Sequence, residues 1–216
     1  MRDEAAGISV KYLESLFAKE SAAHELSKQK MQPSYKAGMS ISAAEASVLR
    51  FLIQTHSYKK AVEIGCFAAY SSLWIAEALD GGELHTFEYN QDHAEMAKEV
   101  IAAYQGPSKI NLHQGDARQG LASIESEGPF DFVFIDANKA GYYEYFLWAE
   151  KNLRTGGMIV GDNTLLFGEV GLDKPDRVSN SQWREMRKFN EAMADSDKFI
   201  NCFVPTTEGL TIALKR

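Results

Sequence analysis

Hydrophobic and polar residues along the chain form blocks that predict strands and helices in alternation. Short apolar runs, typical of buried parallel strands, occupy 60–64, 83–88, 110–114, 130–135 and 158–160. Segments with helical spacing lie at 71–79, 91–104, 121–125, 142–152 and 181–195. Two last strands, at 199–204 and 210–214, are close enough to form an antiparallel hairpin. The pattern predicts an α/β fold: a Rossmann-like, doubly wound, seven-stranded and mostly parallel sheet with a C-terminal antiparallel hairpin.

The part before the first strand is expected to be helical. The spacing predicts one helix over 8–30, with an apolar stripe formed by Val10, Leu13, Leu16 and Phe17. Ser42 and, three residues later, Glu45 form a capping-box pattern that starts a second helix ending near residue 56. We expect a single domain over 1–216, with 1–40 as an N-terminal helical extension and a polar loop at 168–180.

Composition narrows the class of protein. The 216 residues are 45% hydrophobic and 25% charged, which is ordinary for a globular domain, and the net charge is −7. This charge argues against broad adhesion to nucleic acid or anionic membrane. No apolar run reaches about 18 residues, so no membrane span is expected. Cys66 and Cys202 are expected to be free thiols, and the N-terminus lacks the apolar core of a signal peptide, so we expect a cytoplasmic protein.

Polar side chains follow two of the predicted strands. Asp136 comes directly after the run 130–135, and Asp162 and Asn163 follow the run 158–160. Ligands of open α/β sheets bind beyond the carboxyl ends of the strands, so these side chains are expected to face one another. Three hard oxygen ligands with two negative charges suit Mg²⁺ or a similar cation. Each aspartate alone is also compatible with a helix N-cap.

A second set of residues predicts a ligand that contains adenosine. Gly65 stands in the turn after the first strand, where it allows close backbone approach, and Glu88 ends the next strand, where a carboxylate usually binds ribose hydroxyls. Asp116 and Ala117 follow the third strand, in position for an adenine. Individually, Gly65 is compatible with an ordinary tight turn, Glu88 with a solvated strand end and Gly-Asp with a common turn. The GxGxxG fingerprint and the Walker lysine are absent, which argues against NAD and ATP.

With these residues in view, the chain resembles the cation-dependent, S-adenosylmethionine-dependent O-methyltransferases, a family that includes catechol and caffeoyl-coenzyme A O-methyltransferases and bacterial relatives. The resemblance covers roughly residues 37–216. Its matching stretches are 38–42, 62–65 with Tyr70 and Ser71, 87–88, 115–117, 132–139, 156–157 and 161–163. The stretches at 132–139 and 161–163 are specific as a pair, and the others are supportive.

The resemblance implies a role for each matching residue. Asp136, Asp162 and Asn163 would hold the metal, and Lys139 would act as general base, although most lysines are simply solvated at the surface. Asp136 would also lie near the cofactor amine. The implied cofactor residues are Met39, Ile41, Glu63, Gly65, Ser71, Glu88, Asp116 and Ala117. Two departures stand out: Ala69 replaces a usual glycine, and Asn138 replaces an aspartate of many relatives.

The sequence does not identify the methyl acceptor or the oligomeric state. The resemblance implies a small catechol-like or phenolic substrate and a homodimer, with Mg²⁺, Mn²⁺ or Ca²⁺ as the cation. A second acceptor is 5-hydroxyuridine in tRNA, for which the basic residues Lys28, Lys30, Lys36, Lys59 and Lys60 would contact phosphates. We expect 28–40 and 167–180 to frame the acceptor, and Trp148, Trp183, Tyr142 and Tyr143 to line an aromatic pocket or to belong to the core.

Two different classes of protein also have to be considered. One is a nicotinamide-dependent oxidoreductase, which the missing GxGxxG argues against. The second is a cofactor-binding protein without activity, which the complete set of Asp136, Lys139, Asp162 and Asn163 argues against. The methyltransferase hypothesis therefore leads.

Overall fold

A seven-stranded sheet organises the chain. The computed structural model describes residues 2–31 and 39–216, and in these ranges the strands are β1 (Lys60–Ile64), β2 (Glu83–Glu88), β3 (Lys109–Gln114), β4 (Phe130–Ile135), β5 (Leu153–Gly161), β6 (Phe199–Val204) and β7 (Leu210–Lys215). Their order is β3-β2-β1-β4-β5-β7-β6. The first five are parallel, and β7 runs antiparallel to both β5 and β6. The predicted sheet and hairpin are confirmed, and β5 is longer than the predicted 158–160.

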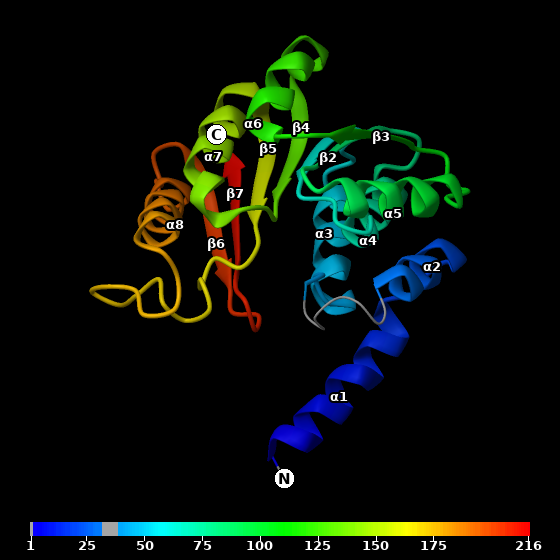
Figure 1. Ribbon diagram of the computed structural model, residues 1–216, viewed down its shortest axis with the longest axis horizontal. Helices are drawn as coiled ribbons and strands as arrows, with labels where there is room; N and C mark the ends of the chain where they lie inside the picture. The colour runs from blue at the N-terminus through cyan, green and yellow to red at the C-terminus, as the bar shows by residue number, and fades with distance from the viewer. Residues whose placement is uncertain (1, 32–38) are drawn as a thin grey trace.

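Helices cover both faces of the sheet (Figure 1). One face packs against α6 (Ala117–Gly120), the 3₁₀ helix η1 (Leu121–Glu127), α7 (Tyr142–Asn152) and α8 (Asn180–Met193). The other packs against α3 (Ala43–Thr55) and α4 (Tyr70–Leu79), while α5 (Gln91–Ala102) completes that layer. The strands supply both cores: in β4, Val133 and Ile135 point to one face, and Phe132 and Phe134 to the other.

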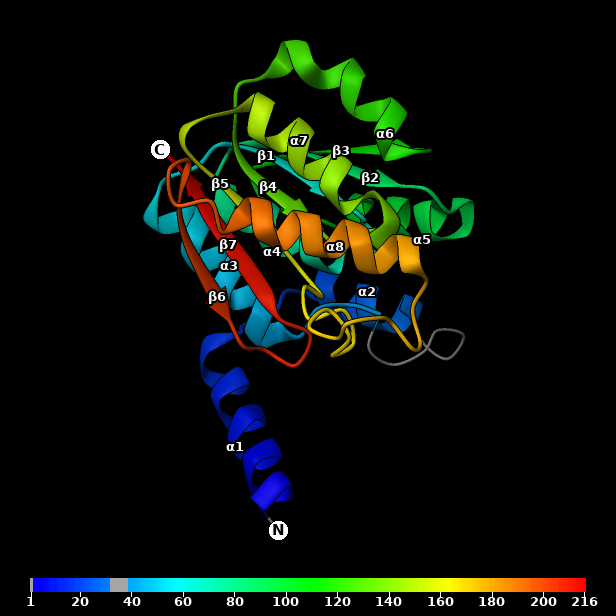
Figure 2. The ribbon, with the colours of Figure 1, turned by 90° about the vertical axis from the view of Figure 1, so that its left-hand side faces the viewer.

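The prediction of one helix over 8–30 is wrong. The structure has α1 (Arg2–Phe17) and α2 (Ala22–Met31), separated by a break. At the break, the Ser21 amide donates to Nδ1 of His24 (3.1 Å), and the His24 ring is fully buried against Tyr70 and Trp74. Burial of this side chain directs α2 onto the body, whereas α1 projects away from it (Figures 1 and 2). The predicted stripe on α1 is exposed: half or more of Leu13 and Phe17 is accessible.

Other local predictions hold with small changes. Ser42 and Glu45 form both hydrogen bonds of the capping box that starts α3. The helix predicted at 121–125 is η1, preceded by α6, and α8 begins one residue earlier than expected, at Asn180. Cys66 and Cys202 are free thiols, as predicted. Within 2–31 and 39–216, no helix is long and apolar enough to cross a membrane.

Candidate functional site

One cavity of about 1000 Å³ lies beyond the carboxyl ends of the central strands. The chain leaves β1 toward β2 and β3, then returns to place β4 on the other side of β1, so this is the switch point where open α/β sheets bind ligands. All residues predicted for the site line the cavity except Glu63: Met39, Ile41, Gly65, Ser71, Glu88, Asp116, Ala117, Asp136, Lys139, Asp162 and Asn163. The fold therefore gathers residues that lie far apart in the chain.

The turn after β1 allows close packing of two strand ends. Gly65 has φ +103°, and a Cβ at this position would lie 1.8 Å from the carbonyl oxygen of Asp136. The neighbouring Ala69, where the resemblance leads us to expect glycine, is buried and has φ +61°. Left-handed conformations of residues with a Cβ are unfavourable by roughly 1–2 kcal/mol. The turn is therefore a strained, tightly packed wall of the cavity.

Glu63 lies beneath this wall. Its carboxylate is fully buried and accepts hydrogen bonds from the hydroxyls of Ser71 (2.5 Å), Ser72 and Thr86 (2.5 Å). Burial raises its pKa to about 7, and the three hydroxyls act in the opposite direction. Its position fixes Ser71, which lines the cavity. The structure thus places Glu63 as a support behind the lining residues.

Glu88 is held by backbone amides. Its two oxygens accept hydrogen bonds from the amides of Phe67 (2.7 Å) and Asn90 (2.8 Å), and Nδ1 of His93 is 3.5 Å from the carboxylate. A carboxylate accepts about four hydrogen bonds, so the two backbone amides do not exhaust the capacity of Glu88. The exposed Tyr89 stands at the same end of the cavity. This arrangement leaves Glu88 able to bind hydroxyl groups of a ligand.

Asp116 has a structural role as well as a place in the cavity. It caps α6 by accepting from the Arg118 amide (2.9 Å), and its carboxylate also contacts the Arg118 guanidinium (2.7 Å). The Arg118 side chain lowers the pKa of Asp116, so this carboxylate is ionised. Ala117 follows it and is buried at the cavity wall. The Gly-Asp pair is therefore a structural turn and a cavity wall at the same time.

The two acidic strand ends meet at the opposite end of the cavity. Parallel pairing of β4 with β5 brings Asp136 and Asp162 to neighbouring positions. Burial, together with the nearby Asp136 carboxylate, raises the pKa of Asp162 to about 8. Asn163 has φ +53°, and its backbone N–H donates to Oδ1 of Asp162 (2.7 Å). Two adjacent carboxylates, one of them buried, with a neighbouring side-chain amide form a site that is complementary to a divalent cation.

Lys139 stands beside this acidic pair. Its Nζ is 3.1 Å from Oδ1 of Asp136 and 2.9 Å from the Tyr142 hydroxyl, and 11% of its side chain is exposed. The Tyr142 hydroxyl in turn donates to the carbonyl oxygen of Asp162 (2.8 Å), with the carbonyl oxygen of Ile135 as a more distant acceptor at 3.2 Å. Lys139 is therefore a fixed, nearly buried amine and not a solvated surface lysine.

For the four aromatic residues left open between pocket and core, the structure selects the core. Trp148, Trp183, Tyr142 and Tyr143 pack in or against the core and do not line the cavity. The phenylalanine and tyrosine rings that line it are Phe67, Phe87, Tyr89, Tyr145 and Phe167. Phe167 belongs to the predicted acceptor frame at 167–180, and Met39 to the frame at 28–40, of which 32–38 lie outside the described residues.

Two further acids of the cavity were not predicted, because their sequence context indicated turns and caps. Glu45 completes the capping box, yet it also lines the cavity and helps to raise the pKa of Asp162. Glu208 stands in the turn between β6 and β7, and its Oε2 is buried with no hydrogen-bond partner among the described residues. No sequence signal would have brought either to the site, because both reach it through the packing of distant elements.

The basic residues considered for RNA contact are dispersed. Lys28 and Lys30 pair with Glu20 and Glu99 near α2. Lys59 and Lys60 lie at the start of β1, where their amines donate to backbone carbonyls. Since the cavity opens at the carboxyl ends of the strands, Lys59 and Lys60 are at the edge of the sheet away from it. Lys36 lies outside the described residues.

Comparisons with known proteins agree with this geometry. A family model described as O-methyltransferase matches residues 14–216. A catechol O-methyltransferase from Niastella koreensis is 39% identical over 141 residues, a match that covers 62% of this chain and 64% of that protein, which is less than two thirds of its length. Caffeoyl-CoA O-methyltransferase 1 of Eucalyptus globulus is 32% identical, with 81% of this chain and 74% of that protein covered.

Solved structures give the same result. The O-methyltransferase TomG from Streptomyces achromogenes, in complex with SAM, superimposes with a TM-score of 0.84 at 32% identity, covering 94% of each chain. An O-methyltransferase from Bacillus cereus in complex with SAH gives a TM-score of 0.85 at 28% identity, with 95% of this chain and 96% of that chain covered. The architecture described above is therefore that of these enzymes.

Proposed function

The chain belongs to the O-methyltransferase family, and we propose that it transfers a methyl group from S-adenosylmethionine to a hydroxyl oxygen of a small catechol-like or phenolic acceptor, in a reaction that depends on a divalent cation. The names of the catechol and caffeoyl-CoA relatives and the SAM complex of TomG support the acceptor class and the donor. The observation that carries the proposal is the meeting of Asp136, Asp162, Asn163 and Lys139 in the cavity that Gly65 and Glu88 also line.

The donor end of the cavity fits S-adenosylmethionine. Glu88 has free lone pairs for two ribose hydroxyls, and Ala117 and Asp116 line the same cavity for the adenine. The close approach at Gly65 leaves no room for a side chain in the wall where the methionine part would pass. Met39 and Ile41 would cover the donor from the N-terminal side. When bound, the sulfonium supplies an electrophilic methyl group and leaves as a thioether.

The acceptor end fits a divalent cation. Asp136, Asp162 and Asn163 would hold it, since among the described residues Lys139 is the one ion-pair partner of the two carboxylates. Mg²⁺ fits this set of oxygen ligands, and Mn²⁺ and Ca²⁺ accept the same ligands. When bound, the cation supplies Lewis-acid stabilisation of negative charge on the acceptor oxygen.

Lys139 is assigned the proton transfer. A free phenol has a pKa of about 10, so it is mostly protonated near neutrality and is a weak nucleophile. The Lys139 amine is held by Asp136 and Tyr142 at the mouth of the acidic site, where it can receive the hydroxyl proton or hold the oxyanion. Fixing the acceptor in line with the methyl group can lower the activation barrier by roughly 7–11 kcal/mol.

The test is a methyl-transfer assay with labelled S-adenosylmethionine on a panel of catechols and single phenols, with and without EDTA. We expect turnover of vicinal diols, loss of turnover in EDTA and recovery on adding Mg²⁺. Bulk tRNA containing 5-hydroxyuridine serves as the second acceptor in the same assay. Full activity in EDTA would remove the cation from the proposal, and binding of S-adenosylmethionine without turnover of any acceptor would favour a protein that has lost activity.

We also propose that a second copy of the chain covers α1. Its apolar side chains Ile8, Tyr12, Leu13 and Phe17 are each at least half exposed, and Phe51 of the neighbouring α3 is exposed too. Exposed apolar patches of this kind usually mark protein contacts. Light scattering measures the molar mass of the protein in solution. We expect the wild type to be a dimer and the Leu13→Lys, Phe17→Lys double variant to be a monomer.

A further inference from the structure

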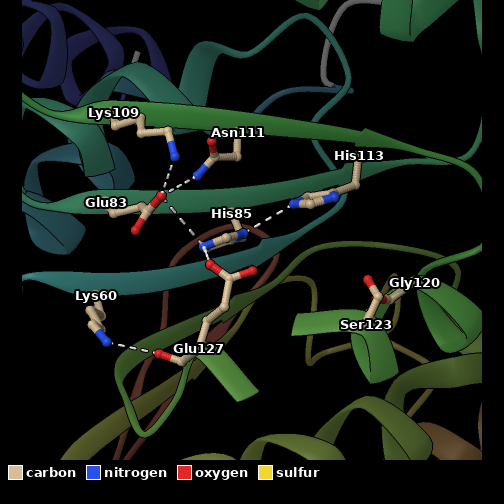
Figure 3. Close-up of polar contacts among 9 residues, drawn as sticks. All are labelled: Lys60, Glu83, His85, Lys109, Asn111, His113, Gly120, Ser123 and Glu127. Carbon is tan, nitrogen blue, oxygen red and sulfur yellow. Dashed lines mark hydrogen bonds and ion pairs between the residues drawn. The ribbon is translucent and has the colours of Figure 1, made fainter. Parts of the chain in front are cut away.

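A compact polar cluster lies toward the amino end of β2, away from the cavity (Figure 3). Glu83 and His85 come from β2, and Glu127 ends η1, which packs over this face of the sheet. One ligand atom from each residue lies within 4.8 Å of the other two. The cluster has no part in the proposed methyl transfer, and none of its members lines the cavity.

We propose that Glu83, His85 and Glu127 bind a divalent transition-metal ion of the zinc class. Zn²⁺ is commonly coordinated by imidazole nitrogen and carboxylate oxygen in four-coordinate sites, whereas Mg²⁺ prefers oxygen ligands alone. One imidazole and two carboxylates are three such ligands, and they leave a fourth position for water. The two sites of the protein therefore differ in chemistry: oxygen donors beyond the carboxyl ends of the strands and a mixed nitrogen and oxygen set here.

His85 is prepared as a ligand by its surroundings. Its side chain is 5% exposed, and its Nε2 points to Oε2 of Glu127 at 3.3 Å and to Oε1 of Glu83 at 3.9 Å. The other ring nitrogen, Nδ1, is 3.0 Å from Nε2 of His113, and the two rings stack. With an ion bound, His85 would donate Nδ1–H to His113 and its Nε2 lone pair would face both carboxylates; without an ion, Nε2–H can donate to Glu127 instead.

His113 then takes the part of the outer partner that metal-bound histidines usually have, because it accepts the second ring N–H and fixes the tautomer. Its own ring is held by stacking on Phe87, at 4.6 Å between centroids. The nitrogen is therefore oriented before any ion arrives.

The two carboxylates are held from outside the cluster. Oε1 of Glu83 accepts from Asn111 (2.7 Å) and from the Lys109 amine (2.7 Å), and Lys109 is 70% exposed, so it is free to move away when a cation enters. The backbone oxygen of Glu127 accepts from Lys60 (2.8 Å), which fixes the end of η1. Glu127 is about half exposed and gives the ion a path from solvent. An ion bound here would tie η1 to β2.

The experiment is a Zn²⁺ titration by calorimetry and thermal shift, in excess Mg²⁺ to fill the oxygen site and in a Cys202→Ser background to remove the exposed thiol. We expect the parent protein to bind one equivalent of Zn²⁺ and to gain thermal stability. The His85→Gln and Glu127→Gln variants should both lose this equivalent, whereas His56→Gln and Glu125→Gln, which alter an exposed histidine and another carboxylate of η1, should keep it.

Two additional measurements make the result decisive. The His113→Asn variant should bind Zn²⁺ about 10- to 100-fold more weakly, since it changes only the outer partner. Nitrogen-15 spectra of the histidines should place the metal on Nε2 of His85 and the proton on Nδ1. Unchanged binding by both His85→Gln and Glu127→Gln, or the metal on Nδ1, would overturn the proposal. If His85→Gln fails to fold, the exposed Glu127→Gln decides alone.

Discussion

Two aspartates lie at opposite ends of strand β4, and their surroundings differ. Asp131, near the start of the strand, accepts from the amides of Lys59 and Lys60 (2.8 Å each) and from the Arg154 guanidinium (2.6 Å). Burial acts to raise the pKa of Asp131, but these donors outweigh it and the pKa is lowered. Asp136, just beyond the end of the strand, has Lys139 as its ion-pair partner and lies beside Asp162, whose pKa is raised to about 8 by burial and by Asp136.

The difference separates a carboxylate whose charge the protein balances from a pair of carboxylates whose charge it leaves poorly balanced. At the amino edge, protein donors satisfy the charge and tie β1, β4 and β5 together. At the carboxyl edge, like charges are brought together and the backbone is strained: Asn163, Leu166 and Phe167 all have left-handed φ, though none is glycine. Strain and unbalanced charge of this kind concentrate at functional sites.

The largest expected effect is at Asp162. Replacing it by asparagine removes one of the two carboxylates of the proposed cation site, so we expect turnover with Mg²⁺ to fall about 1000-fold, equivalent to about 4 kcal/mol. The fold should survive, because the substitution relieves a buried like-charge contact. Steady-state assays and thermal unfolding of the same samples measure both. Loss of the fold together with activity would contradict the contrast with Asp131.

Lys139→Met is expected to have the next largest effect. General acid–base groups typically raise the reaction rate about 100- to 10,000-fold. Turnover should therefore fall by a factor in this range, while S-adenosylmethionine still binds. Lys188→Met is the matched control, since this exposed lysine pairs with Glu185 and also lies over an aromatic ring, that of Tyr143. A Lys139→Met enzyme with wild-type kcat would show that the cation site alone activates the acceptor.

Asp131→Asn is expected to lower stability and to leave activity nearly unchanged, the opposite of Asp162→Asn. It leaves the Arg154 charge and one amide less well paired, so we expect the free energy of unfolding to fall by about 1–3 kcal/mol while kcat changes less than twofold. Urea unfolding of wild type, Asp131→Asn and the exposed Glu185→Gln gives the comparison. Equal stability of Asp131→Asn and wild type would contradict the role assigned to this end of the strand.

The smallest effect is a dependence of stability on pH without divalent cation. The folded-state pKa of Asp162 is above its unfolded value, so the folded form binds more protons, and its contribution to stability falls as the pH rises from about 4 through 8. The pKa of Asp131 is shifted down, so its contribution is present above about pH 4 and is lost below it. In EDTA, the Tm of the wild-type protein should therefore fall toward alkaline pH, and the Tm of Asp162→Asn should fall much less. Added Mg²⁺ should reduce the pH dependence of the wild-type Tm.

Local patterns predicted much of this molecule. The apolar runs and the capping box at Ser42 placed most of the strands and helices within a few residues, because burial on a strand and satisfaction of helix amides are properties of neighbouring residues. The same patterns failed for 8–30, where burial of one side chain, His24, breaks the helix. They also left Tyr142 as a candidate lining residue, although it supports Lys139 from the core.

Local sequence patterns were enough to show which side chains stand at the strand ends and which chemistry they can support. The placement of β4 between β1 and β5, which puts Asp136 beside both Gly65 and Asp162, came from the folded structure. It also brought Glu208 to the cavity and Glu127 to His85. The reason is physical: side-chain periodicity is set within a few residues, whereas strand order and the docking of helices follow from burying apolar faces that lie far apart in the chain.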